Sequence, residues 1–218
     1  MAEEKIIHYY RKTPPPHSLL PSIKEQLSPE EASTILRVDT ESCFNVQLSA
    51  SLDEQETARL EWLLAETFDK TGLQFEKSFF DSDDNNIVVV EFGPRMTFTS
   101  AFSSNATSIC AACGLHAVSR LERSRRYQII FSSSSAGAPT NNDILLSSIK
   151  RLLHDRMTEE EYVIPLTSFE SGVQTKEITW VPIMEEGRSA LEKINNEMGL
   201  GFDEWDLNYY TELFQVCF

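Results

Sequence analysis

Short runs in which hydrophobic residues alternate with polar ones predict several β-strands. The clearest run is Ile87–Phe92, which is rich in β-branched residues and has the length of a strand. Gly93 and Pro94 are expected to end it, because glycine permits a bend and proline cannot donate to a ladder. The other predicted strands are Lys5–Lys12, Cys43–Leu48 and the segment in which Tyr127, Ile129 and Phe131 alternate.

Hydrophobic residues three and four positions apart predict the helices. The clearest helix is Asp53–Phe68, where Asp53 is expected to cap the first turn and Glu56 occupies the capping-box position. Ser28 followed by Pro29 indicates another helix start. The remaining predictions are helices over Leu19–Leu27, Asn105–Cys113, Asn141–Leu153 and Glu185–Met198, a last helix capped by Asp203, and a Ser/Thr-rich loop over Thr97–Ser104.

Each predicted helix has one hydrophobic face that is expected to point into a core. The residues expected to point inward are Leu60, Leu63, Leu64, Thr67 and Phe68; Leu145, Ile149, Leu152 and Leu153; Leu191, Ile194 and Met198; and Leu207, Tyr210, Leu213 and Phe214. Strands and helices together predict an α+β fold, in which an antiparallel sheet packs on helices in an N-terminal two-layer domain and a mostly helical acidic domain follows.

The best candidate for a domain boundary is Ser132–Pro139, because small polar residues with glycine and proline form no core. We therefore expect an N-terminal domain over residues 1–133, a connecting segment over 134–182 that contains the helix of 141–153, and the start of a second domain over 183–218. Charge supports a change of character along the chain: residues 155–218 contain 14 acidic and 4 basic residues.

Composition excludes several classes of protein. Hydrophobic residues make up 41% of the 218 and charged residues 24%, which is typical of soluble globular proteins. The net charge of −15 argues against binding to nucleic acid or to an anionic membrane. No apolar run is long enough to span a bilayer, and no signal peptide is visible. With four cysteines and no such signal, we expect free thiols and a cytoplasmic location.

No set of residues predicts a catalytic, cofactor or metal site. Cys110-x-x-Cys113 is a single pair, whereas a structural zinc site needs four ligands, so two buried inert thiols are expected. The four histidines are scattered, and His154 is expected to stabilise the end of a helix. A cysteine or histidine nucleophile assembled only in space remains an alternative.

Arginines supply the one candidate binding surface. Four arginines form a cluster in the sequence, and Arg95 precedes them. The cluster consists of Arg120, Arg123, Arg125 and Arg126. One interpretation is a docking surface for an acidic partner domain or a phosphate. The other is a strand end whose charges pair with Glu122 and acidic neighbours.

The stretch Gly93–Tyr127, which reads GPRMTFTSAFSSNATSICAACGLHAVSRLERSRRY, resembles the N-terminal region of the phosphoribosylformylglycinamidine synthase family. Further blocks resemble the same family in the same order, so that the resemblance covers roughly residues 42–214. These blocks are Cys43–Val46, Leu60–Thr67, Leu153–Glu159 and Glu186–Glu192.

The resemblance implies a function that composition and spacing do not. The family converts formylglycinamide ribonucleotide to formylglycinamidine ribonucleotide with ATP, magnesium and ammonia released from glutamine. As a truncated product, this chain would supply only the N-terminal scaffold domain and the start of the linker domain. It would be inactive alone, and its partners would be the synthetase and glutaminase domains. The alternative is an independent regulatory or protein-interaction module without the enzyme body.

Overall fold

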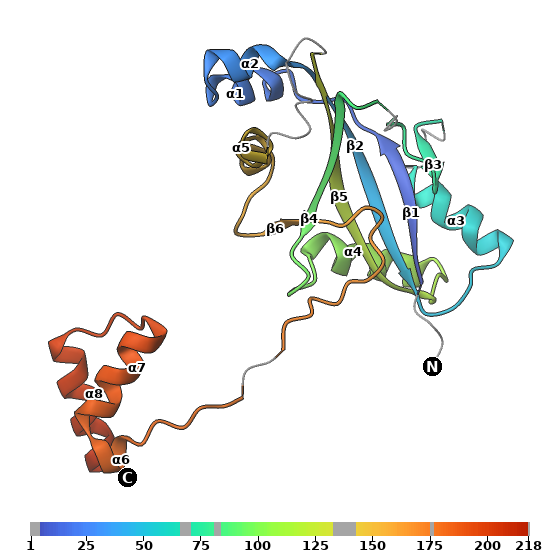
Figure 1. The fold of residues 1–218 in the computed structure, drawn as a ribbon. Coiled ribbons are helices and arrows are strands. Elements are labelled where there is room, and N and C mark those ends of the chain that lie inside the picture. Colours follow the sequence, from blue (N-terminus) through green and yellow to red (C-terminus); the bar gives the residue numbers. More distant parts are fainter. Residues whose placement is uncertain (1–4, 66–70, 81–83, 133–142, 175–176, 218) are drawn as a thin grey trace. The chain divides into compact units, whose positions relative to one another are not determined.

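The fold is built on a sheet of six strands in the order β3-β1-β2-β5-β4-β6, with every neighbouring pair antiparallel (Figure 1). The computed structural model describes residues 5–65, 71–80, 84–132, 143–174 and 177–217. The strands are β1 Lys5–Lys12, β2 Ile35–Leu48, β3 Leu73–Phe75, β4 Ile87–Pro94, β5 Val118–Phe131 and β6 Glu159–Glu161.

Eight helices lie within the described residues, and an α+β fold is thereby confirmed. They are α1 Leu19–Glu25, α2 Pro29–Thr34, α3 Glu54–Leu64, α4 Ala101–Ala112, α5 Asp143–Leu153, α6 Ile183–Glu186, α7 Arg188–Met198 and α8 Glu204–Cys217. The predicted capping box at Asp53 is present, and the predicted cap at Ser28 proves to be a capping box as well: each residue accepts from the backbone of a glutamate three residues on, whose side chain accepts in return. Asp203 accepts likewise from the amide of Asp206, at 2.9 Å.

One face of the sheet packs against the helices through two hydrophobic clusters. The first joins β1, β2 and β5 to α3 and α4, and it includes Val46, Leu60 and Leu115, all 0% exposed. The second joins β2, β4 and β5 to α1 and α5, and it includes Ile23, Ile129 and Ile149. In Figure 1, α4 accordingly lies near one end of the long strands, and α1 and α2 near the other.

The other face of the sheet carries polar side chains and is covered by irregular chain. Tyr162, Leu166 and Phe169 form a third buried cluster there, with Ile6 and Met96 packed against it. The covering segment follows β6 and is anchored to β4, since the Tyr162 amide donates to the Glu91 carbonyl at 2.8 Å. This face is therefore buried without being hydrophobic, and it holds the side chains of the candidate site.

Three strands extend beyond their predicted bounds, and one of them is β5, which begins at Val118 rather than near Tyr127. β2 begins at Ile35 rather than Cys43, because its first half pairs with the end of β5, a long-range partner that leaves no local signal. β4 continues through Gly93 and Pro94, because these two residues pair with Glu160 and Glu159 of β6. Proline is tolerated there because the pairing of β4 with β5 ends at Phe92, so that Pro94 has a strand neighbour on the β6 side alone.

Four helix predictions are wrong in part. The expected loop before α4 is helical from Ala101, because Ser100 caps the helix by accepting from the Ser103 amide at 3.0 Å. The helix expected over Glu185–Met198 is divided at Gly187, whose φ of 58° interrupts it. Leu152, Met198 and Leu213 do not point inward, since 41%, 66% and 37% of their surfaces are exposed.

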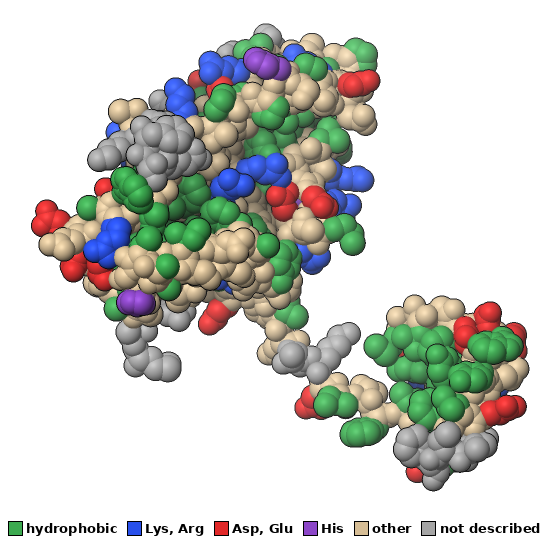
Figure 2. Space-filling view, turned by 180° about the vertical axis from the view of Figure 1, so that it is seen from behind, with side chains coloured by type: hydrophobic (Ala, Val, Ile, Leu, Met, Phe, Trp, Pro, Cys, Tyr) green, Lys and Arg blue, Asp and Glu red, His purple; other side chains and the backbone are tan. Residues whose placement is uncertain are grey.

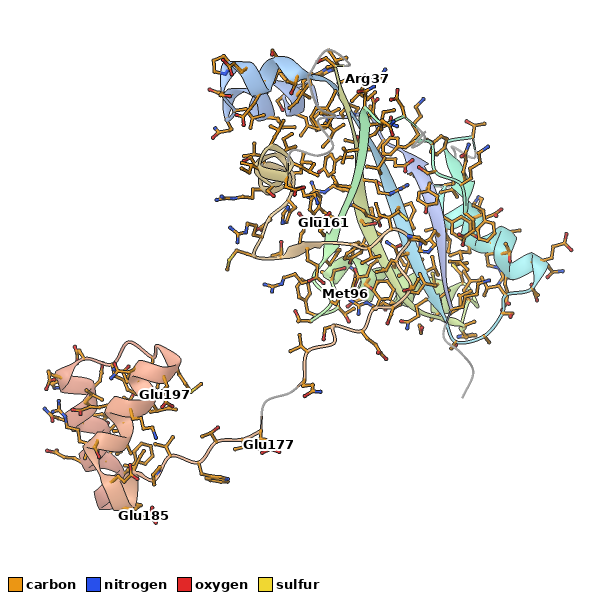
Figure 3. All side chains as sticks on the ribbon, viewed as in Figure 1. Arg37, Met96, Glu161, Glu177, Glu185 and Glu197 are labelled. Carbon is orange, nitrogen blue, oxygen red and sulfur yellow. The ribbon has the colours of Figure 1, made fainter. Side chains whose placement is uncertain are left out.

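The described chain divides into two compact units, residues 1–172 and 173–218. The first contains the whole sheet and helices α1 to α5; the second contains α6, α7 and α8, labelled with Glu185 and Glu197 in Figure 3. The predicted boundary at Ser132–Pro139 lies almost entirely outside the described residues, as do Thr67 and Phe68 of the predicted α3 stripe. The predicted domain division therefore stays a prediction.

Candidate functional site

The strand pairing divides the arginine cluster between the two faces of the sheet. Arg123 and Arg125 lie opposite Phe44 and Phe92, which belong to the helix-covered face. Arg120 and Arg126 lie on the opposite, polar face. Arg95 directly follows β4, where its amide donates to the Thr158 carbonyl at 3.0 Å and its side chain is exposed.

Arg126 is the centre of a row of charges that crosses three strands. It pairs in register with Glu41 of β2 on one side and with Glu91 of β4 on the other. Its Nη1 forms an ion pair with Glu41, and its Nε lies 3.2 Å from Glu91 Oε2. The guanidinium is 4.8 Å from the ring centroid of Tyr10. All three charged side chains are at most 6% exposed, so removing one would leave the others buried without a partner.

Glu41 also holds a segment that crosses the polar face. Its carboxylate accepts from the Ser78 hydroxyl at 2.6 Å and from the Phe79 amide at 2.9 Å. The next residue, Phe80, places its ring centroid 5.9 Å from the Arg126 guanidinium. The charged row therefore fixes a connection between strands as well as the strands themselves.

Glu91 is held by neutral groups in addition to Arg126. The Ser124 hydroxyl donates to Glu91 Oε1 at 2.5 Å, and the Asn45 amide donates to Ser124 at 2.9 Å. Asn45 Oδ1 in turn lies 2.9 Å from His8 Nδ1. Burial raises the pKa of Glu91 above its usual value, while the hydrogen bond from Ser124 and the charge of Arg126 oppose that rise.

Arg120 forms a second buried ion pair on the polar face. It lies 3.0 Å from Glu122, whose side chain is 0% exposed, and its guanidinium lies 4.4 Å from the ring centroid of Phe169. The same carboxylate accepts from the hydroxyl of Ser100 at 2.5 Å and from its amide at 3.1 Å. Glu122 thus fixes the residue that caps α4, which ties the start of this helix to the sheet.

Three arginines of the predicted set remain exposed. Arg123 lies 5.1 Å from the ring centroid of Phe102, and Arg125 donates to both carboxylate oxygens of Glu159, at 2.7 and 2.8 Å. Arg95 is the third. Figure 2 shows basic side chains next to acidic ones on the visible side of the sheet unit, and not gathered in one patch.

The reactive side chains do not assemble a catalytic group in the described part of the chain. Burial raises the pKa of Cys43 well above its usual value and raises that of Cys110, which is the opposite of what a nucleophilic thiol requires. His154 Nδ1 lies 2.7 Å from the Lys150 carbonyl, and its ring stacks on Phe92 at 4.2 Å. No group of three potential metal ligands occurs among the described residues, and no described helix is long and apolar enough to cross a membrane.

Sequence reasoning missed the carboxylates that pair with Arg126 and the neutral side chains that hold them. Glu41, Glu91, Asn45 and Ser124 received no role, because single polar residues in strands are typical of a solvent-facing side. The signal that was present is the spacing: Arg120, Glu122, Ser124 and Arg126 alternate along β5 and therefore share one face.

The helical unit carries a different kind of surface. Trp180, Ile178 and Trp205 are 88%, 83% and 69% exposed, and the Trp205 ring stacks on Tyr209 at 5.2 Å. A cavity of about 460 Å³ lies between the start of α6 and Phe214 of α8. Exposed hydrophobic side chains of this size are typical of an interaction surface.

Comparison with known proteins assigns a relationship to most of the chain. The family model described as formylglycinamide ribonucleotide amidotransferase N-terminal matches residues 41–165. A phosphoribosylformylglycinamidine synthase of Dictyostelium discoideum is 42% identical over 96% of the chain, and a probable synthase of Arabidopsis thaliana, named chloroplastic/mitochondrial, is 42% identical over 97%. The Homo sapiens synthase is 32% identical over 96%. The chain spans about 15% of the length of each of these three relatives.

Proposed function

We propose a function from one premise: this chain belongs to the formylglycinamide ribonucleotide amidotransferase N-terminal family. The proposal is that it is the N-terminal scaffold of a phosphoribosylformylglycinamidine synthase. Such an enzyme converts formylglycinamide ribonucleotide, glutamine and ATP to formylglycinamidine ribonucleotide, glutamate, ADP and phosphate, a step in purine biosynthesis. The role proposed for this chain is to hold the synthetase and glutaminase parts of that enzyme together, without taking part in the chemistry.

One observation carries this proposal. The chain aligns with long synthases over nearly all of its own length and over only 15% of theirs. A scaffold role also fits the chemistry of the sheet, where buried Glu41, Glu91 and Glu122 hold strands and loops in place. Burial keeps the thiols of Cys43 and Cys110 unreactive, whereas Cys113, which was expected to be buried as well, is partly exposed.

The proposed partners would contact exposed groups of both units. In the sheet unit these are Arg95, Arg123 and Arg125, the members of the cluster that remain accessible. In the helical unit they are the exposed aromatic side chains around Trp180 and Trp205. Arg120 and Arg126 would support such a contact only indirectly, because their guanidinium groups are engaged inside the fold.

ATP and magnesium would be bound by other parts of the proposed enzyme. The described residues do not fit a metal, since no three potential ligands are grouped among them. The proposed location is the cytosol. The name of the Arabidopsis relative assigns that protein to chloroplasts or mitochondria, so the location is not inferred from that relative.

A chimeric enzyme tests the scaffold role. The corresponding N-terminal region of the Dictyostelium synthase is replaced by this chain, and glutamine-dependent product formation is compared with that of a version in which the region is deleted. We expect the chimera to be active and the deletion to be inactive. A deletion as active as the parent would contradict the proposal.

The isolated chain provides the complementary test. It should hydrolyse neither glutamine nor ATP, and a turnover above about 0.1 per second, against roughly 10 per second for a typical enzyme, would refute a non-catalytic role. In the chimera, replacing both Arg123 and Arg125 by alanine should lower activity more than replacing Arg37, an exposed arginine of β2 that pairs with Asp39.

A further inference from the structure

An aromatic pocket lies at the β3 edge of the sheet, between that edge and α3. It has a volume of about 220 Å³ and is lined by Tyr9 of β1, Phe75 of β3, and Glu61 and Trp62 of α3, among others. The rings of Tyr9 and Phe75 lie 5.1 Å apart, and Phe75 and Trp62 are 52% and 47% exposed. Large aromatic groups are thus left accessible around a hollow that is part of a well-packed domain.

The Tyr9 hydroxyl is an unpartnered polar group in the wall of this pocket. The side chain is 1% exposed, yet its Oη atom has no hydrogen-bond partner in the part of the chain that the structure describes. Buried polar atoms are nearly always paired, so an unpaired one calls for an explanation such as an absent ligand. Burial raises the pKa of Tyr9 to about 12, and the charges of Glu61 and then Glu76 add to that rise.

Two carboxylates, those of Glu61 and Glu76, place negative charge near the Tyr9 hydroxyl. Glu76 is occupied, because its carboxylate accepts from the His8 amide at 2.9 Å, whereas no ion pair of Glu61 occurs within the described residues. Two arginines near α3 bond to backbone carbonyls: Arg11 donates to the Leu64 carbonyl at 3.1 Å and Arg59 to the Cys113 carbonyl at 2.6 Å. Lys5 lines a neighbouring cavity.

We propose that this pocket binds the guanidinium group of an arginine side chain that a partner protein presents. The planar group would stack against Trp62 and Phe75, donate to the free carboxylate of Glu61 and supply the missing partner of the Tyr9 hydroxyl. Arginine fits better than lysine, because its planar, weakly hydrated group stacks on aromatic faces while it donates to a carboxylate.

Size and position favour a protein side chain over a free ligand. The volume is below the roughly 300–1,000 Å³ of typical small-molecule pockets and suits one side chain. β1 also extends beyond its partner on this edge: β3 pairs with Tyr9, Tyr10 and Arg11, while β1 begins at Lys5. A partner's main chain would therefore find strand edge beside the pocket, as in β-strand addition.

Tryptophan fluorescence of the full chain tests the proposal. Of the three tryptophans, Trp180 and Trp205 lie in the helical unit and are exposed, so the variant W180F/W205F leaves Trp62 as the sole reporter. The probes are the capped tripeptide acetyl-Gly-Arg-Gly-amide and the same peptide with neutral citrulline, at matched ionic strength. The arginine peptide should change Trp62 emission saturably with a Kd of about 1–10 mM, because one stacked ion pair contributes modestly.

Matched variants separate the contributions. Glu61→Gln should weaken binding about fivefold or more, whereas Glu54→Gln, an exposed glutamate of the same helix that does not line the pocket, should change nothing. Tyr9→Phe should weaken binding about two- to fivefold while keeping or raising the melting temperature, because it removes an unpaired buried hydroxyl. A purely structural role for Tyr9 would change stability and not binding.

Several results would overturn the inference. Equal binding of the citrulline and arginine peptides would show an apolar pocket without cation recognition. Equal effects of Glu61→Gln and Glu54→Gln, or no saturable signal up to about ten times the expected Kd, would refute the site itself. Argininamide that binds as tightly as the tripeptide would assign the pocket to a free small cation and refute docking of a protein.

Discussion

Gly93 should not tolerate even one added methyl group, because the Tyr162 ring lies against it. A Cβ atom built on Gly93 would lie 2.4 Å from Cζ and 2.5 Å from Cε2 of this ring, well inside van der Waals contact. The ring cannot easily move away. Its hydroxyl donates to the Pro94 carbonyl at 2.6 Å, and the Tyr162 amide donates to the Glu91 carbonyl at 2.8 Å.

The magnitude follows from how the clash is relieved. If the ring shifts within its cluster, overpacking costs about 1–3 kcal/mol. If the ring is expelled, the loss approaches that of truncating a large buried aromatic side chain, about 3–5 kcal/mol. We therefore expect Gly93→Ala to lower the free energy of unfolding by about 2–4 kcal/mol, with backbone strain making no contribution because φ at Gly93 is not in the left-handed region.

Urea unfolding followed by far-ultraviolet circular dichroism measures this change, and a double-mutant cycle assigns it. In a Tyr162→Ala background the obstacle is gone, so Gly93→Ala should cost nothing or stabilise slightly. Tyr162→Phe is the control for the hydroxyl and should cost only about 1 kcal/mol. The reasoning fails if Gly93→Ala costs the same with and without the Tyr162 ring.

Three further predictions follow from burial and charge. Burial raises the pKa of Glu91 above its unfolded value, so its stabilising contribution is present below pH 4.5 and is lost as pH rises through the folded pKa. The stability of wild type relative to Glu91→Gln, measured by urea unfolding at several pH values, should therefore fall as pH rises from 4.5, and an opposite slope would refute this. Cys113 should be alkylated before Cys43 and Cys110 in the native protein, as read by mass spectrometry, because Cys113 is partly exposed whereas the other two are buried; early labelling of Cys43 would contradict the buried network around it. Amide hydrogens of Glu204–Phe214 should exchange faster than those of Val88–Val90, since α8 lies in a small unit with much exposed hydrophobic surface; equal protection would be evidence against that picture.

Local signals determined the elements whose reasons lie within a few residues. The bounds of β1, the caps at Ser28, Asp53 and Asp203, and the left-handed end of α7 at Gly199 all follow from neighbours in the sequence. The confirmed α+β class follows from the same periodicities. The start of α4 was missed although its cap is local, since Ser100 accepts from the Ser103 amide; Glu122, 22 residues away, holds this capping residue in addition.

The candidate site likewise depends partly on local sequence and partly on long-range pairing. The sequence alone indicated a cluster of arginines, but it could not show which of them are buried. Pairing places Arg126 between Glu41 and Glu91, residues 85 and 35 positions away, and only the register of three strands brings these charges into one row.

By itself the sequence determined most of the helices and the main strands, because caps and apolar spacing act between near neighbours. The short strands β3 and β6 at the edges of the sheet were not predicted, since they form only against distant partners. Only the tertiary structure decided that the polar side of the sheet is an interior. On β5, Glu122, Ser124 and Arg126 have the alternation of a solvent face, and they are buried because Ser78–Phe80 and Tyr162–Phe169 cross over them. A strand's own residues do not encode which distant segment will cover it, so burial of that face is a property of the assembled fold.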